Sequence, residues 1–191
     1  MSSLSDGDTN KQLRWFVGVP LGTNPLILVD LVTVLAIAWG VSFLALLLLQ
    51  FALGGYLAPD HLGAAADLSS YLTLVFVALY LVICFFIMRN HYAALYRFDS
   101  SGIYCENMRA HPRALDKALF RFRAYPIEPQ RESIRSVEKR AGWRDVTRVQ
   151  QLKDLRVLIL KGKRGTLMRV YCPDDHIFNE ALAFIQEKTV L

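Results

Sequence analysis

Two long runs without a charged residue limit what this 191-residue chain can fold into. They extend from Leu31 to Leu53 and from Leu68 to Met88. At about 1.5 Å of helical rise per residue, runs of 23 and 21 residues reach across a hydrocarbon core of about 30 Å. Lipid admits only helices or closed barrels, and continuous apolarity favours helices over alternating strands. Because buried core helices usually have shorter apolar runs, we predict two transmembrane helices that form a helical hairpin.

Charge is distributed as unevenly as hydropathy. Residues 1–88 hold two basic and five acidic residues, whereas residues 89–191 hold 20 basic and 12 acidic ones. The connection 54–67 has no lysine or arginine. By the positive-inside rule we expect this loop outside and both the N- and C-termini in the cytoplasm, in a multi-pass protein of the cell inner (plasma) membrane. The net charge of +5 is therefore first a topological signal.

The two runs divide the chain into three predicted regions. We expect 1–25 to be a cytoplasmic tail and interfacial segment, 26–89 to be the two-helix transmembrane hairpin, and 90–191 to be a cytoplasmic domain. Trp15 and Phe16 would lie in the headgroup zone, where aromatic side chains are enriched.

Asp30 lies at the start of the first run. A carboxylate in a spanning segment can mark an ion path or a proton relay. Its place at the cytoplasmic start of the helix, where the helix dipole attracts an anion, favours a capping role at the interface instead. No charge lies near the middle of either run. The hairpin is therefore more typical of an anchor than of a transporter.

Residues 90–191 combine strand and helix patterns. Tyr96–Glu106 predicts a β-hairpin with an Asp-Ser-Ser-Gly turn, and 161–165 predicts a tight turn between two further strands. Asp174 and Asp175 are suited to cap a closing amphipathic helix. We therefore predict a small α+β domain, a bent antiparallel sheet with a C-terminal helix. The other predicted elements are a helix over 111–123 and strands over 143–149, 154–160 and 166–172.

Two spanning helices followed by Tyr96–Tyr104, Trp143–Val146 and a final hairpin plus helix resemble bacterial membrane proteins with a pleckstrin-homology-like (PH-like) domain. The resemblance covers 26–88 for the anchor and about 90–191 for the domain. It implies a C-terminal helix that plugs one end of a barrel of strands, and a long insertion over 109–140 between strands. The family is mostly without assigned activity, so the resemblance implies a fold more than a function.

Two groups of basic residues are candidates for binding. The first repeats at four-residue intervals on the predicted helix, and the second lies at the tight turn. Their members are Arg113, Lys117 and Arg121, and Lys161, Lys163 and Arg164, respectively. A solvated helix face is the simplest interpretation. Contact with anionic lipid comes next, because each basic residue near a membrane can contribute about 1 kcal/mol. Nucleic-acid binding comes last, because acidic residues are interspersed and no recognition motif is present.

No catalytic constellation is visible in the sequence. The four histidines are isolated, no metal-ligand spacing occurs, and no glycine-rich phosphate loop is present. Cys84, Cys105 and Cys172 lack a CxxC spacing and are predicted to be buried, reduced thiols. We therefore expect no enzyme activity, no cofactor and no metal.

Two functional hypotheses remain. The favoured one is a non-enzymatic, inner-membrane-anchored scaffold or accessory subunit. Its cytoplasmic PH-like domain would bind anionic lipid headgroups or a protein partner, in a membrane complex or a homo-oligomer, and not nucleic acid. The alternative is a small membrane enzyme or transporter component with a dispersed active site, for which Asp30, Cys172 and His176 are candidates.

Overall fold

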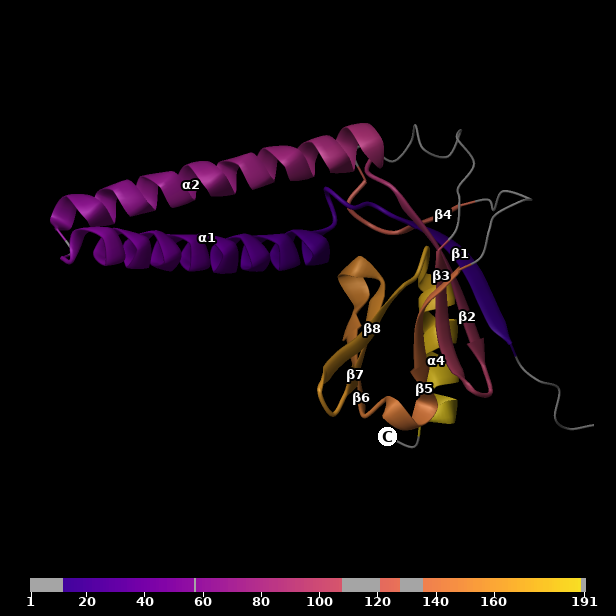
Figure 1. Ribbon diagram of the computed structural model, residues 1–191. Coiled ribbons are helices and arrows are strands. Elements are labelled where there is room, and N and C mark those ends of the chain that lie inside the picture. The colour runs from indigo at the N-terminus through magenta and orange to yellow at the C-terminus, as the bar shows by residue number, and fades with distance from the viewer. Residues whose placement is uncertain (1–11, 57, 108–120, 128–135, 190–191) are drawn as a thin grey trace, which may run out of the picture. The chain divides into compact units, whose positions relative to one another are not determined.

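The computed structural model describes residues 12–56, 58–107, 121–127 and 136–189. The chain divides into two compact units, and each is described by itself (Figure 1). The helical unit comprises Leu21–Asn90, and the sheet unit comprises Met1–Pro20 together with His91–Leu191. The helical unit is therefore an insertion in the sequence of the sheet unit.

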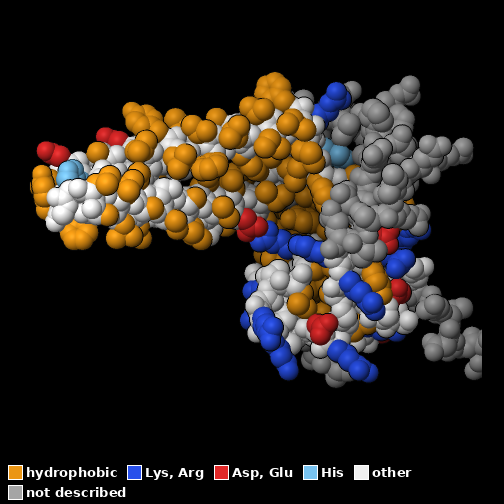
Figure 2. Space-filling view, in the orientation of Figure 1, with side chains coloured by type: hydrophobic (Ala, Val, Ile, Leu, Met, Phe, Trp, Pro, Cys, Tyr) orange, Lys and Arg blue, Asp and Glu red, His pale blue; other side chains and the backbone are white. Residues whose placement is uncertain are grey.

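The helical unit consists of two long antiparallel helices. Helix α1 spans Pro25–Gly54, and α2 spans Pro59–Leu81 and continues as a π-helix, η1, over Val82–Ile87. Both helices are long and apolar enough to cross a membrane, and hydrophobic side chains cover the surface of this unit (Figure 2). The second helix begins earlier than predicted, because proline at its first position starts it inside the expected 54–67 loop.

Asparagine side chains form hydrogen bonds at both chain ends of the helical unit. Asn24 caps α1 by accepting a hydrogen bond from the amide of Leu26. Asn90 is fully buried, accepts from the amide of Gly22 at 2.5 Å and donates to Thr23 Oγ1 at 3.0 Å. Asn90 also has a positive φ of 53°, which asparagine tolerates better than most residues. The two chain ends of the helical unit are thereby tied to one another.

The sheet unit contains two antiparallel sheets. The first has the order β4-β1-β2-β3-β5 and the second the order β6-β7-β8. Strands of the first sheet are β1 Leu13–Val19, β2 Tyr92–Asp99, β3 Gly102–Asn107, β4 Tyr125–Pro126 and β5 Ser136–Gly142. Those of the second are β6 Arg148–Leu152, β7 Val157–Gly162 and β8 Gly165–Tyr171, and helix α4 follows at Asp175–Lys188. The expected single bent sheet is thus divided into two.

Strand β1 corrects the prediction for the N-terminal region. Residues 13–19 were expected at a membrane interface, but they form a central strand that pairs along its whole length with β2. Trp15 is only 5% exposed, packs against Tyr96 and Phe98, and donates from Nε1 to the carbonyl of Tyr171 at 2.9 Å. Because that carbonyl belongs to β8, Trp15 joins the two sheets. Its aromatic ring is part of the protein core.

The later elements agree with the prediction in type but differ in their bounds. The predicted strand at Trp143 begins instead with a 3₁₀ turn, η2, over Trp143–Asp145, because the indole Nε1 donates to the carbonyl of Asp99. A second 3₁₀ turn, η3, occupies Lys153–Leu155, so β7 begins at Val157 rather than at the predicted residue 154. The hairpins β2–β3 and β7–β8 and the closing helix are confirmed. The predicted helix over 111–123 lies largely outside the described residues, and its last three residues are not helical.

Helix α4 closes the core between the sheets. Asp174 caps it by accepting from the amide of Ile177 at 2.8 Å, as the sequence predicts. The buried face of the helix consists of Phe178, Ala181, Phe184 and Ile185. Phe184 lies edge-on to Phe98 and contacts the ring of Trp143. An aromatic cluster therefore fills the core beside the β2–β3 turn.

Candidate functional site

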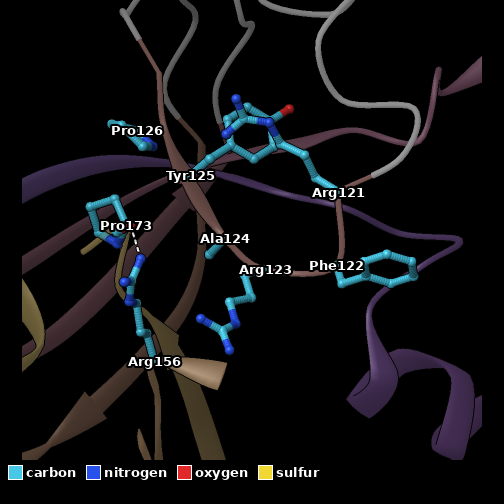
Figure 3. Close-up of a pocket in the computed structure, with 8 residues that line it drawn as sticks. All are labelled: Arg121, Phe122, Arg123, Ala124, Tyr125, Pro126, Arg156 and Pro173. Atoms are coloured by element: carbon cyan, nitrogen blue, oxygen red, sulfur yellow. Dashed lines mark hydrogen bonds between the residues drawn. The ribbon is translucent and has the colours of Figure 1, made fainter. Parts of the chain in front are cut away.

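A hollow of about 450 Å³ lies in the sheet unit between the segment around β4 and the chain at both ends of the β7–β8 hairpin (Figure 3). None of the described residues that line it is acidic. They are Arg121, Phe122, Arg123, Ala124, Tyr125, Pro126, Arg156 and Pro173. Three arginines around one hollow make this basic pocket the candidate site, because guanidinium groups recognise carboxylate and phosphate.

Arg156 is held firmly on one wall of the basic pocket. Its backbone adopts the left-handed conformation, with φ 56°, at the end of η3. Its carbonyl accepts from the amide of Cys172 at 2.9 Å. Its guanidinium donates to both carboxylate oxygens of Asp175, at 2.8 and 2.9 Å, and to the carbonyl of Pro173. The left-handed backbone conformation of Arg156 is costly for a residue other than glycine, and it persists where the surrounding structure imposes it. Arg156 is therefore preorganised, although Asp175 offsets much of its charge.

The opposite wall is the irregular segment that leads into β4. The side chain of Arg123 is exposed and extends from this segment toward the side of the hollow that holds Arg156 (Figure 3). Phe122, between Arg121 and Arg123 in the sequence, also lines the hollow, and its ring is 62% exposed and directed away from Arg156 (Figure 3). An exposed aromatic ring flanked by two arginines is an uncommon arrangement, since large apolar side chains are usually buried.

Tyr125 forms the inner part of the basic pocket. The guanidinium of Arg121 lies 4.7 Å from the centre of its ring, and its hydroxyl is hydrogen-bonded to the Nδ1 of buried His91. Burial raises the pKa of Tyr125 to about 12, despite the opposing charge of Arg121, and burial lowers the pKa of His91. Both groups are therefore neutral at pH 7. Tyr125 anchors the segment and contributes no charge to the pocket.

The register of the strands places the basic pocket at one end of the sheet unit. Tyr125 pairs with Gly18, one residue before the Val19–Tyr92 pair that ends the β1–β2 ladder. A Cβ atom on Gly18 would lie 2.6 Å from the ring of Tyr125, so glycine permits this close approach. We call this the connected end, because the chain leaves the sheet unit after Pro20 and returns at His91. The far end holds the turns at Gly102 and Gly162.

The structure describes four of the six basic residues that the sequence offered as candidate lipid contacts, and it places Arg121 apart from the other three. Arg113 and Lys117 lie outside the described residues. Arg121 lines the basic pocket. Lys161, Lys163 and Arg164 lie at the opposite end of β7 from Arg156, in and beside the β7–β8 turn. Lys163 and Arg164 are exposed.

Sequence reasoning missed Arg123, Tyr125 and Arg156. The alternation Arg121-Phe122-Arg123 was a usable signal, since it places an apolar ring between two charges. Arg156 had no comparable signal, because its neighbours in the pocket are distant in the sequence.

A second basic surface follows one row across the first sheet. Arg14, Arg97, Tyr104 and Arg140 are successive cross-strand partners on β1, β2, β3 and β5. The guanidinium groups of Arg97 and Arg140 lie 4.6 and 5.2 Å from the ring centre of Tyr104. Arg97 also forms ion pairs with Asp99 and Glu106. Much of its charge is thus compensated, and the row lines no described hollow.

The candidates for chemistry do not form a site in the described part of the chain. All three cysteines are buried thiols that form no disulfide, as predicted, and burial raises the pKa of Cys172 to about 12. His176 is exposed and its nearest charged partner is Glu180, at 3.8 Å. Among the described residues no group of three or more His, Cys, Asp and Glu side chains could hold a metal ion. No family model, curated protein or solved structure matches this chain.

Proposed function

We propose that this protein is a membrane-anchored, non-enzymatic scaffold or accessory subunit, and that its sheet unit binds anionic lipid headgroups. The observation that carries the proposal is the place of the helical unit in the sequence. The two apolar helices are inserted between β1 and β2, which are neighbours in one sheet. The sheet unit is therefore attached by two connections at the same end. A domain attached in this way is held at the bilayer with less freedom than one attached by a single linker.

The order of the strands supports a PH-like interpretation of the sheet unit. Strands β1, β2, β3 and β5 form one meander, β6, β7 and β8 form a second, and α4 closes the core. The short strand β4 is added at the edge beside β1. The final hairpin and the C-terminal helix are the features that agree with the resemblance drawn from the sequence. The helical unit would then be an insertion after the first strand rather than an anchor that precedes the domain.

The choice between lipid and protein as the main partner follows from the basic pocket. Its described lining has three arginines and no acidic residue, which suits a compact anion. The exposed apolar surface of the helical unit would instead bind a protein partner in a membrane complex, or a second copy of this chain. Nucleic acid is disfavoured, because the basic residues that the structure describes in the sheet unit lie at both of its ends and on one sheet face rather than along a continuous groove.

The proposed anchoring is tested with the full chain, because a fragment starting at residue 90 lacks the central strand β1 and the Trp15 side chain. Expressed in bacteria, the protein should stay in the membrane pellet after extraction with alkaline carbonate. Tags at the two termini should both be protected in sealed right-side-out vesicles and both be cleaved in inverted ones. Release by carbonate, or termini on opposite sides, would contradict the proposal.

A further inference from the structure

We propose that the basic pocket binds the phosphodiester headgroup of an anionic phospholipid, with Arg123 and Arg156 as its phosphate ligands and Phe122 inserted among the lipids. This inference rests on the proposed function and names the site and the ligand class. Of the basic residues that the sequence offered as lipid contacts and that the structure describes, Arg121 alone lines the pocket.

The charges of the pocket suit a phosphate group. Asp175 offsets much of the charge of Arg156, so the net positive charge of the pocket comes mainly from Arg121 and Arg123. Arg156 contributes a preorganised donor: three of its five N–H groups are used by Asp175 and the carbonyl of Pro173, and it loses little side-chain freedom when it binds. Arg123 approaches from the other wall (Figure 3), and no carboxylate among the described residues lines the space between the two walls. Two guanidinium groups on opposite walls can donate to different oxygens of one phosphate. The volume of about 450 Å³ lies in the range of small-molecule sites, so it can also hold the polar group esterified to the phosphate.

Phe122 favours a lipid over a soluble phosphate compound. Its ring lies at the edge of the hollow away from Arg156 and is 62% exposed, and this exposure of an apolar ring to water is unfavourable. Aromatic side chains are favoured at the membrane interface, and arginines beside them can reach lipid phosphates. A segment with this pattern is suited to a surface that is apolar on one side and anionic on the other.

The connections to the helical unit are short and begin at the end of the sheet unit that holds the pocket. Only five residues separate the end of β1 at Val19 from the start of α1 at Pro25. Six residue steps span at most about 21 Å. Asn90, the last residue of the helical unit, is joined directly to His91, which contacts Tyr125 in the pocket. Both connections therefore join the sheet unit at the end that holds the pocket.

The test uses the full chain purified in a neutral detergent and titrated with lipid, with native mass spectrometry as the readout. Phosphatidylglycerol, phosphatidylcholine and glycerol 3-phosphate are the three probes. The deciding variant is Arg123→Gln, because Arg123 takes part in no described hydrogen bond or ion pair, so its loss should leave the fold intact. Lys163→Gln is the matched control, with the same charge change at the far end of the same unit. Retention of the variants in the membrane pellet reports separately on the anchor.

We expect the protein to retain phosphatidylglycerol in preference to phosphatidylcholine. Arg123→Gln should weaken this binding about tenfold, the usual effect of losing a hydrogen bond between charged groups. Phe122→Ser should weaken binding of the long-chain lipid, and Lys163→Gln should change it less than about twofold. Equal effects of Arg123→Gln and Lys163→Gln would overturn the site while leaving the anchor proposal standing. Binding of glycerol 3-phosphate as tight as that of phosphatidylglycerol, and lost in Arg123→Gln, would overturn the lipid as ligand.

Discussion

The two ends of the sheet unit both carry basic residues, but they use them differently. At the connected end, Arg156 is fixed by Asp175 and Arg121 lies over Tyr125, so the charges surround a hollow. At the far end, Lys163 and Arg164 extend into solvent from a two-residue turn between Gly162 and Gly165. Positive charge in the sequence is therefore a poor guide to a binding site by itself. The difference lies in the neighbours that hold each side chain.

The ends also differ in what fills them. The far end is closed by the aromatic cluster of Phe98, Trp143 and Phe184. The connected end contains a buried polar contact between His91 and Tyr125. We therefore expect the far end to determine stability and the connected end to determine binding and the response to pH. Four predictions test this division.

The largest effect is expected for Phe184→Ala. The side chain is 4% exposed and contacts two aromatic rings, so its removal should leave a cavity and lower the free energy of unfolding by about 3–5 kcal/mol. Near-ultraviolet circular dichroism of the full chain in detergent, followed through a urea titration, measures the loss. Leu48→Ala on α1 is the control, because Leu48 is 68% exposed and leaves no cavity inside the protein. Equal losses for the two variants would show that the aromatic cluster is not the core of the far end.

A smaller effect is expected for Gly102→Ala in the β2–β3 turn. Gly102 has φ 157°, and a Cβ atom there would lie 2.4 Å from the carbonyl oxygen of Ala141. Strain and clash together should lower the free energy of unfolding by about 1–3 kcal/mol. Gly165→Ala is the matched control, since Gly165 has φ 126° but open space at its Cβ position. The same urea titration should show a clearly smaller loss for Gly165→Ala, and the reverse order would refute the clash.

The connected end should be sensitive to mild acid. Burial lowers the pKa of His91 below 6.5, so the unfolded chain binds a proton more readily than the folded one. The contribution of His91 to stability is complete above pH 6.5 and is lost as the pH falls through its folded pKa. His91→Gln should therefore flatten the decrease in the free energy of unfolding between pH 7 and pH 5. An unchanged slope in this variant would assign the acid sensitivity to other groups.

The smallest effect is expected for the basic turn at the far end. Lys163→Gln and Arg164→Gln should each change the free energy of unfolding by less than about 0.5 kcal/mol, because both side chains are exposed and surface charges contribute little. Thermal unfolding of the full chain measures this change. A loss above about 1 kcal/mol would mean that the turn has contacts comparable to those of Arg156.

The sequence was sufficient wherever the decisive contacts are local. Uninterrupted apolarity predicted the two helices, the Asp-Ser-Ser-Gly and Gly-Lys-Arg-Gly segments predicted two hairpins, and Asp174 predicted the start of α4. Each of these signals lies within a few residues of the element it specifies. For the same reason, the candidate site was predicted only in part, through Arg121.

Strand β1 and the basic pocket depended on contacts between distant parts of the chain. Trp15 and Phe16 are equally suited by their side chains to a membrane interface and to a strand. Their place in a strand is determined by two contacts with distant parts of the chain. One is the pairing of β1 with β2, which follow one another in the sequence only after the inserted helices, and the other is the hydrogen bond from Trp15 to Tyr171, 156 residues away. Arg156 and Arg123 likewise line one pocket only because β7 begins beside the segment that pairs with Gly18. The sequence alone determined that this chain has two apolar helices and an α+β domain, because periodicity and turn chemistry are local. Tertiary structure decided that the helices interrupt a sheet and where the arginines gather, because burial and strand pairing depend on the whole chain.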